Sequence, residues 1–314
     1  SPAAQGHAHS SCGHFSISAF GEYFAVDSGR YNMEQNCHNV TLVDGKSGRD
    51  TRGQWEYAKH DGVLGAFEPG DLVDTASVDS SHQHDCLWAR RHLGLVRGRG
   101  APPYVWVVDD INKNNDWGRY WWQLHTCPEN RLRLYRAHAT VTGWRCGNKM
   151  DVHFALPAPE DYERPHELLG LEQDMAEPSS YKYVGPFSQD RLKQFDRPAD
   201  QIHYSTFRRP RLIAKIAGLC GRFMSLMLPR EKGMQPASVR RLRSLTGSLA
   251  VRIAFEKVED TLIWAYEHGV LEAGDVSARG QWCLVRRARK SGRVLEHAVG
   301  DGTRLEVAGR RVPL

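Results

Sequence analysis

The chain has 314 residues with a formal net charge of +5, and 40% of its residues are hydrophobic and 25% charged. This composition is typical of a globular protein and excludes a disordered or collagen-like chain. No stretch approaches the roughly 18 uncharged apolar residues of a membrane-spanning helix. Lys215 and Arg222 interrupt even the apolar segment 212–228, so no membrane span is expected.

Cationic residues gather in two segments, 208–222 and 286–293, and are compatible with an anionic partner. Neither segment interleaves its charges with aromatic residues as nucleic-acid-binding surfaces do, so no nucleic-acid partner is expected. The seven cysteines form no Cys-x-x-Cys pair and no dense disulfide framework. They leave the redox compartment of the protein open.

The predicted elements are almost all strands, because short segments alternate apolar and polar residues and a helical period is seldom sustained. The first is a hairpin, with one strand over 15–19, a turn at Gly21-Glu22 and a return strand over 23–26. Asp44-Gly45 is typical of a type I′ turn. Further strands are expected at 40–42, 104–108, 120–124, 131–136 and 152–156.

Seven prolines and many charges mark the segment from Pro157 to about Pro210, which is expected to be a long irregular insertion with a short helix near 190–195. Strands resume after it, at 212–217, 222–228, 248–256, 261–266 and 281–287, followed by a hairpin around Asp301-Gly302. We therefore predict one all-β domain over 1–314, an antiparallel β-sandwich with 157–210 as its irregular insertion.

The most distinctive motif is Gly6-His7-Ala8-His9. On a strand, residues i and i+2 project to one face, so both imidazoles would point into one space. The triplet alone is weak, since chance gives roughly one His-x-His in a chain of this composition and a second one stands at 82–84. The chain also opens directly on this motif, so we expect it to be the C-terminal part of a longer protein.

The following residues strengthen the motif, because Gly13-His14-Phe15, Val26-Asp27-Ser28-Gly29 and the strand Cys37-His38-Asn39-Val40-Thr41-Leu42-Val43-Asp44-Gly45 follow in order. Together they resemble the C-terminal β-sandwich of the heparinase II/III-like polysaccharide lyases, which has a supersandwich-like fold. The similarity extends through Arg90-Arg91 and Asp109-Asp110 to the strand that ends at His125, and so covers roughly residues 6–155.

The resemblance implies a role for four residues. His7 would be a catalytic histidine, and His9, Asp27 and His38 would hold a divalent metal ion, usually zinc. Two imidazoles and a carboxylate are a normal ligand set for such an ion. One position departs from the family, because many members have an acidic residue two positions after the second histidine, where this chain has Ser11.

The activity implied by the resemblance is β-elimination on a uronic-acid polysaccharide of the heparan sulfate or alginate type. The family places the tyrosine acid and further substrate-binding groups in an N-terminal α/α toroid, which would precede this chain in the full-length protein. The family also implies a periplasmic or extracellular bacterial enzyme that needs an acidic polysaccharide as its partner. The isolated chain is then expected to be inactive.

Other interpretations of the residues remain open. His9 and Asp27 would also suit a hydrogen-bonded structural pair. His14 is expected to pack or to form a hydrogen bond, and His125 to have a structural role at a strand end. Residues 82–85 are expected to form a solvated loop, and the tryptophans are expected to be core residues. A noncatalytic carbohydrate-binding domain is the main alternative function. A cupin-type metal enzyme fits less well, because the chain has no glutamate four or five residues after His9.

Overall fold

The computed structural model describes residues 9–27, 34–46, 48, 62–136, 138–157, 170–176 and 209–313. Nearly all of these residues belong to antiparallel strands or the turns between them. Within these ranges two short helical turns occur, η1 (Gln35–Cys37) and α1 (Ser81–His84). No helix among them is long and apolar enough to cross a membrane. The predicted all-β class is confirmed.

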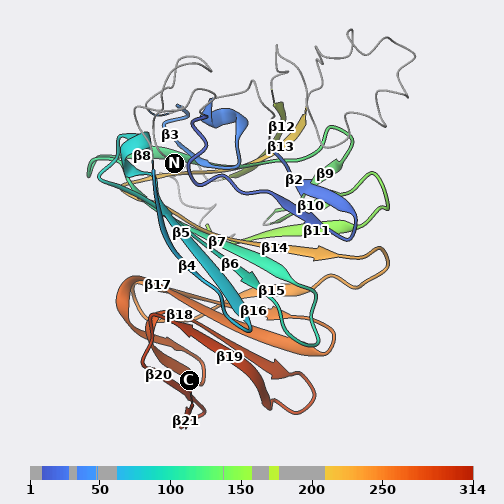
Figure 1. The fold of residues 1–314 in the computed structure, drawn as a ribbon, viewed down its shortest axis with the longest axis vertical. Helices are drawn as coiled ribbons and strands as arrows, with labels where there is room; N and C mark the ends of the chain where they lie inside the picture. Colours follow the sequence, from blue (N-terminus) through green and yellow to red (C-terminus); the bar gives the residue numbers. More distant parts are fainter. Residues whose placement is uncertain are drawn as a thin grey trace.

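Three large sheets stack in layers, and the β1–β2 hairpin accompanies the first of them (Figure 1). The hairpin consists of β1 (Ile17–Ala19) and β2 (Glu22–Ala25). The first outer layer is a four-stranded sheet with the order β12 (Gly170–Ala176), β13 (Arg209–Gly218), β8 (Gly118–His125) and β3 (Thr41–Val43).

The middle layer is an eight-stranded sheet. Its order is β4 (Val63–Glu68), β5 (Val73–Asp79), β6 (Trp88–Val96), β7 (Tyr104–Asn112), β14 (Gly221–Arg230), β11 (Lys149–Leu156), β10 (His138–Thr142) and β9 (Arg131–Leu134).

The third layer is a seven-stranded sheet at the C-terminal end of the chain. Its strands are β15 (Ser238–Leu242), β16 (Ser248–Ala254), β17 (Val258–Ala273), β18 (Val276–Ala288), β19 (Val294–Gly300), β20 (Arg304–Val307) and β21 (Arg310–Val312).

The middle sheet contributes to two separate cores, because successive side chains of a strand point to opposite faces. On β7, Val107 and Ile111 pack with Trp122 in the core under the four-stranded sheet. Trp106 and Val108 of the same strand pack in the core shared with the seven-stranded sheet. Each fully buried side chain of this size contributes about 1.5–3 kcal/mol, so the alternation fixes which face of β7 meets which layer.

One predicted turn has the expected type, and a second is shifted by one residue. Asp44 and Gly45 have φ values of 55° and 68°, and a Cβ on Gly45 would lie 2.6 Å from the Trp121 ring, so glycine is required there. The first hairpin is present, but its register pairs Ala19 with Glu22. Its turn therefore falls on Phe20 and Gly21, one residue earlier than predicted.

The segment 157–210 is not irregular throughout. β12 lies inside it and pairs along its length with β13 as the edge strand of the four-stranded sheet. Cross-strand pairs of Arg211 with Asp174 and of Lys215 with Glu172 stabilise this charged strand. The helix predicted near 190–195 lies outside the described residues.

The predicted hairpin at Asp301-Gly302 is wrong. β19 and β20 do not pair with each other, and both pair with β18, β19 along 282–287 and β20 along 276–279. The turn signal is real, since Asp301 has a φ of 52°. The turn at Asp301 separates β19 from β20, and both strands pair with the same edge of β18.

Candidate metal centre

Three segments of the N-terminal part of the chain bring the predicted ligands together. His9 precedes a tight turn in which the His14 N–H donates to the Ser11 carbonyl at 2.8 Å. Asp27 follows β2, and His38 directly follows η1 as its C-terminal cap. All three positions lie just outside regular structure, where the backbone can turn side chains toward a common point.

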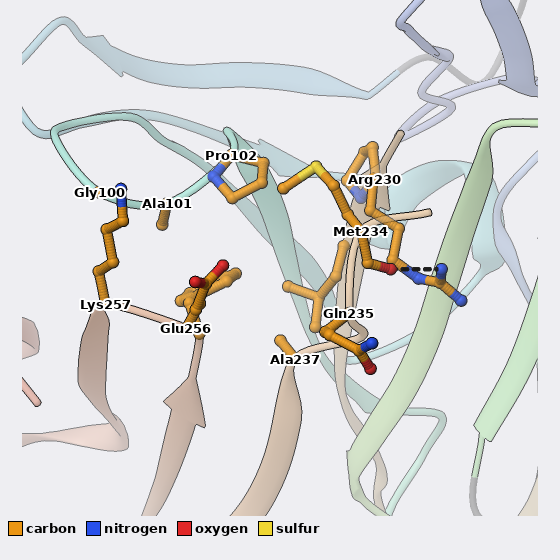
Figure 2. Close-up of a pocket in the computed structure, with 12 residues that line it drawn as sticks. Gly100, Ala101, Pro102, Arg230, Met234, Gln235, Ala237, Glu256 and Lys257 are labelled. Carbon is orange, nitrogen blue, oxygen red and sulfur yellow. Dashed lines mark hydrogen bonds between the residues drawn. The ribbon is translucent and has the colours of Figure 1, made fainter. Parts of the chain in front are cut away.

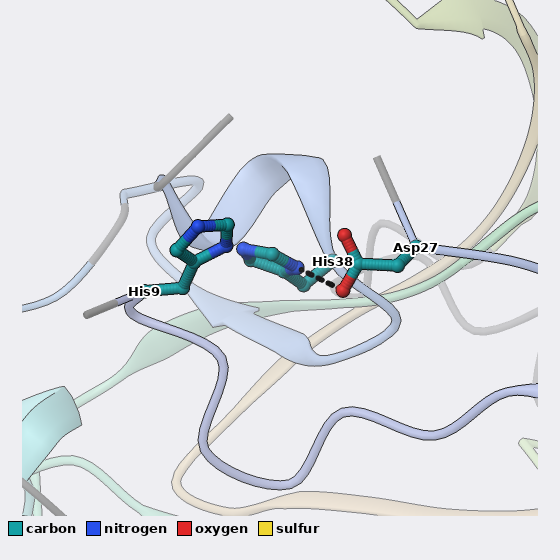
Figure 3. Close-up of side chains that lie close together, drawn as sticks. All are labelled: His9, Asp27 and His38. Carbon is teal, nitrogen blue, oxygen red and sulfur yellow. Dashed lines mark hydrogen bonds and ion pairs between the residues drawn. The ribbon is translucent and has the colours of Figure 1, made fainter. Parts of the chain in front are cut away.

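His9, Asp27 and His38 each offer a ligand atom, and these atoms all lie within 4.8 Å of one another. The His38 Nδ1 is 3.2 Å from the Asp27 Oδ2, and the His9 and His38 ring centroids are 5.2 Å apart. Figure 3 shows the imidazole of His38 beside that of His9, with its Nδ1 facing the Asp27 carboxylate. The structure thus brings together the three residues predicted to bind a metal.

The donor set fits a zinc-like ion. Two ligands about 2.0–2.1 Å from zinc in a tetrahedral arrangement are about 3.4 Å apart, close to the separation of His38 and Asp27. His38 is fully buried, and its Nε2 has no hydrogen-bond partner within the part of the chain that the structure describes. An ion bound between the His38 Nδ1 and Asp27 would not reach this second nitrogen, because the two ring nitrogens of an imidazole point in different directions.

His14 lies beside this cluster but is suited to orient Asp27 instead of binding the ion. Its Nδ1 accepts the backbone N–H of Asn39 at 3.0 Å, so the neutral ring carries its proton on Nε2. That Nε2 lies 3.4 Å from the Asp27 Oδ2 and 3.2 Å from the Ser16 hydroxyl. Burial lowers the pKa of His14 to about 4, which keeps the ring neutral. The predicted packing or hydrogen-bonding role is confirmed.

Asn39, the residue after His38, joins the segments that carry the cluster. Its side-chain amide donates to the carbonyls of Phe15 and Val26, at 2.8 and 3.2 Å. Its Oδ1 accepts the backbone N–H of His125 at 2.7 Å. One buried side chain therefore links the stretch after His14, the end of the hairpin before Asp27, and β8.

Arg91 on β6 also holds the segments around His14 and His38 in place. It forms a buried bidentate ion pair with Asp109 on β7, with distances of 2.6 and 3.0 Å. Its Nη1 donates to the carbonyls of Gly13 and Asn39, both at 2.7 Å. The guanidinium thus holds two loop carbonyls against the middle sheet, one next to His14 and one next to His38.

His125 is fully buried at the end of β8, in agreement with its predicted structural role. Its Nδ1 lies 3.2 Å from the Asn39 Oδ1. Burial, with the nearby Arg209 and Arg211, lowers its pKa well below the usual 6.5, so the ring is neutral.

The prediction of a solvated loop at 82–85 is wrong for Gln83 and His84, which are both buried. His84 is buried in the short helix α1, although His82 is exposed. Burial lowers the pKa of His84 to about 4. Asp85 follows in the left-handed conformation, ends the helix and directs the chain toward β6.

Two other predictions concern the tryptophans and His7. Trp106 and Trp122 are buried core residues as expected, whereas Trp117 is exposed. His7, the predicted catalytic residue, lies outside the described residues. The supporting roles of Asn39 and Arg91 were not predicted, although both residues belong to the segments on which the resemblance rests.

One cavity lies apart from the His9–Asp27–His38 cluster. It has a volume of about 350 Å³ and lies between the β6–β7 loop, the end of β14 and the β16–β17 turn (Figure 2). Gly100, Pro102, Met234, Phe255 and Lys257 are among its lining residues. It is therefore a separate feature from the candidate metal centre.

No protein-family model and no curated protein matches the sequence. Among solved structures, the fold is similar to that of a mutant of the heparan sulfate lyase HepC from Pedobacter heparinus, with a TM-score of 0.57 and 13% sequence identity. The similarity covers 92% of this chain and 37% of that chain. At this identity the likeness shows the fold alone: the chain has a polysaccharide-lyase-like β fold and spans about a third of that lyase.

Proposed function

We propose that the chain is the β-sandwich part of a polysaccharide lyase that cleaves uronic-acid polysaccharides by β-elimination. The observation that supports this proposal most directly is the convergence of His9, Asp27 and His38 within a fold similar to a heparan sulfate lyase. Neither the fold nor the cluster suffices alone, because a fold hosts many functions and small His/Asp clusters also occur as structural pairs.

In this proposal His9, Asp27 and His38 hold a zinc ion, which would supply a fixed positive charge and tie the N-terminal segment to η1. His14 orients the Asp27 carboxylate through its Nε2 proton. Asn39 and Arg91 hold the backbone on either side of His38 and His14. Such outer contacts fix ligand geometry and matter for affinity almost as much as the ligands.

His7 is the proposed catalytic residue of this chain, on the strength of the sequence resemblance. In β-elimination a base takes the C5 proton of the uronate, the C4–C5 double bond forms, the C4–O4 bond breaks and an acid protonates the departing O4. His7 would act as one member of this acid and base pair or hydrogen-bond to the uronate carboxylate, whose charge rises as the proton leaves.

The remaining catalytic groups would come from an N-terminal α/α toroid in a longer protein, which would act outside the cytoplasm. The resemblance implies both features. A polymer substrate of high negative charge suits the net charge of +5 of this chain.

The test measures the unsaturated product by its absorbance, with the chain joined to such a toroid and with heparan sulfate, chondroitin and alginate as substrates. The intact protein should cleave at least one of them. His7→Ala should abolish turnover with an unchanged melting temperature, and His9→Ala should lower the melting temperature as well, because it removes a ligand. Normal turnover by His7→Ala would refute the assignment. Binding without cleavage would favour a carbohydrate-binding domain.

A further inference from the structure

The strands β9, β10 and β11 form one end of the middle sheet, and only one of their faces is covered by the first core. Leu132, Ala139 and Val152 point into that core. Alternation directs the neighbouring residues to the opposite side. We call this side the β9–β11 outer face, and define it by three cations, Arg131, Arg133 and Lys149, and three rings, Tyr135, His138 and His153.

The seven-stranded sheet leaves this face open. On the side of the middle sheet, the described residues of the second core lie on or beside β5, β6, β7, β14 and the end of β11, and none lies on β9 or β10, although β15 contacts β11. Figure 1 shows β9 and β10 at the side of the molecule, away from β17 to β21. Arg131, Arg133 and Tyr135 on this face are exposed, and are therefore accessible to a ligand.

The charge of the β9–β11 outer face is positive. The register pairs Arg131 with Thr142, Thr142 with Lys149, and Lys149 with Arg230, which places a polar row across four strands. Of the described strand residues on this face, Asp151 is the one carboxylate. It is buried and bound by Arg230 at 2.7 Å and by the Thr140 hydroxyl at 2.7 Å. The acid is thus neutralised within the sheet, while Arg131 and Arg133 are exposed.

The three rings form a stack across the same strands. The Tyr135 and His138 centroids are 4.3 Å apart with an interplanar angle of 7°, and those of His138 and His153 are 4.8 Å apart at 12°. The Arg133 guanidinium lies 5.1 Å from the Tyr135 centroid on this stack. Each ring in the stack presents a face to a neighbouring ring, so its polar edge is the part that remains to contact a ligand.

Burial lowers the pKa of both imidazoles, that of His153 to about 4. Each ring is therefore neutral and offers one donor and one acceptor nitrogen. Cations beside neutral hydrogen-bonding groups match a polymer that carries carboxylates or sulfates together with hydroxyls. A nucleic acid would instead favour exposed ring faces on which bases stack, and here the neighbouring rings occupy those faces.

We propose that the β9–β11 outer face is a second binding surface for an acidic polysaccharide, separate from the metal centre. Arg131, Arg133 and Lys149 bind carboxylate or sulfate groups of the polymer, and the edges of Tyr135 and His138 bind its hydroxyls. The proposal rests on the proposed function for the class of ligand, and it adds a site that holds the polymer away from the bond that is cleaved.

The experiment measures binding of the 314-residue chain to size-defined heparan sulfate, to alginate and to neutral dextran by titration calorimetry. A variant with Arg131→Ala, Arg133→Ala and Lys149→Ala tests the cations. Its control, Lys290→Ala, Arg310→Ala and Arg311→Ala, removes the same charge from exposed residues of the seven-stranded sheet. Tyr135→Phe removes one hydroxyl and leaves the charge unchanged. Circular dichroism verifies that each variant is folded.

We expect the first variant to bind an acidic polymer about tenfold more weakly, Tyr135→Phe to bind about twofold more weakly, and the control to bind within twofold of the original chain. Dextran should not bind. Equal losses in the first variant and in the control would overturn the surface and indicate diffuse attraction. Equally tight binding of a short DNA duplex, lost in the same variant, would overturn the preference for polysaccharide.

The binding test of the β9–β11 outer face can fail independently of the cleavage test of the proposed lyase activity. Cleavage of a short oligosaccharide by the longer protein should be unchanged by the triple substitution, since the surface lies outside the metal centre. Unchanged polymer binding together with intact cleavage would overturn the surface alone. Absence of cleavage by the unsubstituted protein would overturn the proposed function, whatever the binding results for the surface.

Discussion

Two buried ion pairs in this molecule have almost the same construction and serve different regions. Arg91 and Asp109 stand opposite each other on β6 and β7, as Arg286 and Asp260 do on β18 and β17. Both pairs are bidentate, with N–O distances of 2.6 and 3.0 Å in the first and 2.7 and 2.7 Å in the second. In each, the free guanidinium nitrogen donates to a loop carbonyl.

The difference lies in what each guanidinium holds. Arg91 binds the carbonyls of Gly13 and Asn39, next to the candidate metal centre. Arg286 binds the carbonyl of Arg97 in the β6–β7 loop, and its partner Asp260 accepts the Tyr104 hydroxyl at 2.8 Å. The second pair thus joins the middle sheet to the seven-stranded sheet. The same chemistry supports a site in one place and a contact between layers in the other.

The largest effect is expected for Arg91→Met. Removing one partner of a buried pair leaves Asp109 buried with the Thr41 hydroxyl, 3.3 Å away, which should cost about 3–5 kcal/mol in the free energy of unfolding. Zinc affinity should fall about 10- to 100-fold as well, because the backbone beside His38 loses its anchor. Urea unfolding and competitive zinc titration measure the two effects.

The adjacent Arg90 is the control for that substitution, since it is exposed and its nearest contact with Asp79 is 3.5 Å. Arg90→Met should change stability by less than about 1 kcal/mol and leave zinc affinity unaltered. Zinc affinity that stays normal in Arg91→Met would mean that the pair does not support the site.

Arg286→Met should cost a similar amount of stability, about 3–5 kcal/mol, because Asp260 is fully buried. Zinc affinity measured on the folded fraction should be unchanged. A fall in zinc affinity equal to that of Arg91→Met would show that global destabilisation explains both variants, and the distinction between the two regions would be lost.

Asn39→Ala sharpens the comparison at the scale of single hydrogen bonds. It leaves two carbonyls and the N–H of His125 without their partner, and each such group costs about 1–3 kcal/mol when it stays buried. Asn148 is a matched control, because it is also buried and binds the Phe20 carbonyl and the Lys232 N–H away from the site. Both alanine variants should lose stability, and only Asn39→Ala should lose zinc affinity. Calorimetric melting measures the stability of each variant, and zinc titration measures its zinc affinity.

A smaller effect is expected from acid. The pKa of His84 is about 4 in the folded chain against an ordinary 6.5, so the unfolded chain binds the proton first. Stability from this group is complete above pH 6.5 and is lost as the pH falls toward 4. Around Arg286, the buried Tyr104 has a raised pKa and does not titrate in acid. Hydrogen exchange at pH 5 should therefore increase in 80–91 before it increases in 258–288.

His84→Gln removes the titrating group and should flatten part of this pH dependence. Equal acid sensitivity of both regions in the original chain, or an unchanged profile in His84→Gln, would contradict the assignment of the effect to His84.

Most strands could be predicted from the sequence, since an alternating or short apolar run bounded by turn residues is a local property, and β14 is an almost continuous run of this kind. β12 could not, because its Glu172 and Asp174 lower strand propensity and are stabilised by Lys215 and Arg211 about forty residues away. The connection between β19 and β20 was wrongly predicted as a hairpin for a related reason. A turn signal gives the local conformation and not the strand with which the next residues pair.

For the site, the three clustered residues were predicted from a motif resemblance that covers a short stretch of chain. The support could not be predicted, because Arg91 reaches the Gly13 carbonyl across 78 positions of sequence and Asn39 reaches His125 across 86. Contacts of this kind depend on how the layers stack. Burial of His84 depends on the same stacking, and the sequence around it read as a polar loop.

The most direct test of the account is the zinc content of the purified chain after dialysis against zinc and then against zinc-free buffer. We expect about one zinc ion per chain, none in His38→Ala or Asp27→Ala, and full content in His297→Ala, a substitution of a half-buried histidine that binds the Pro313 carbonyl near the C-terminus. Retention of zinc by both His38→Ala and Asp27→Ala, or its absence from the unsubstituted chain, would contradict the account.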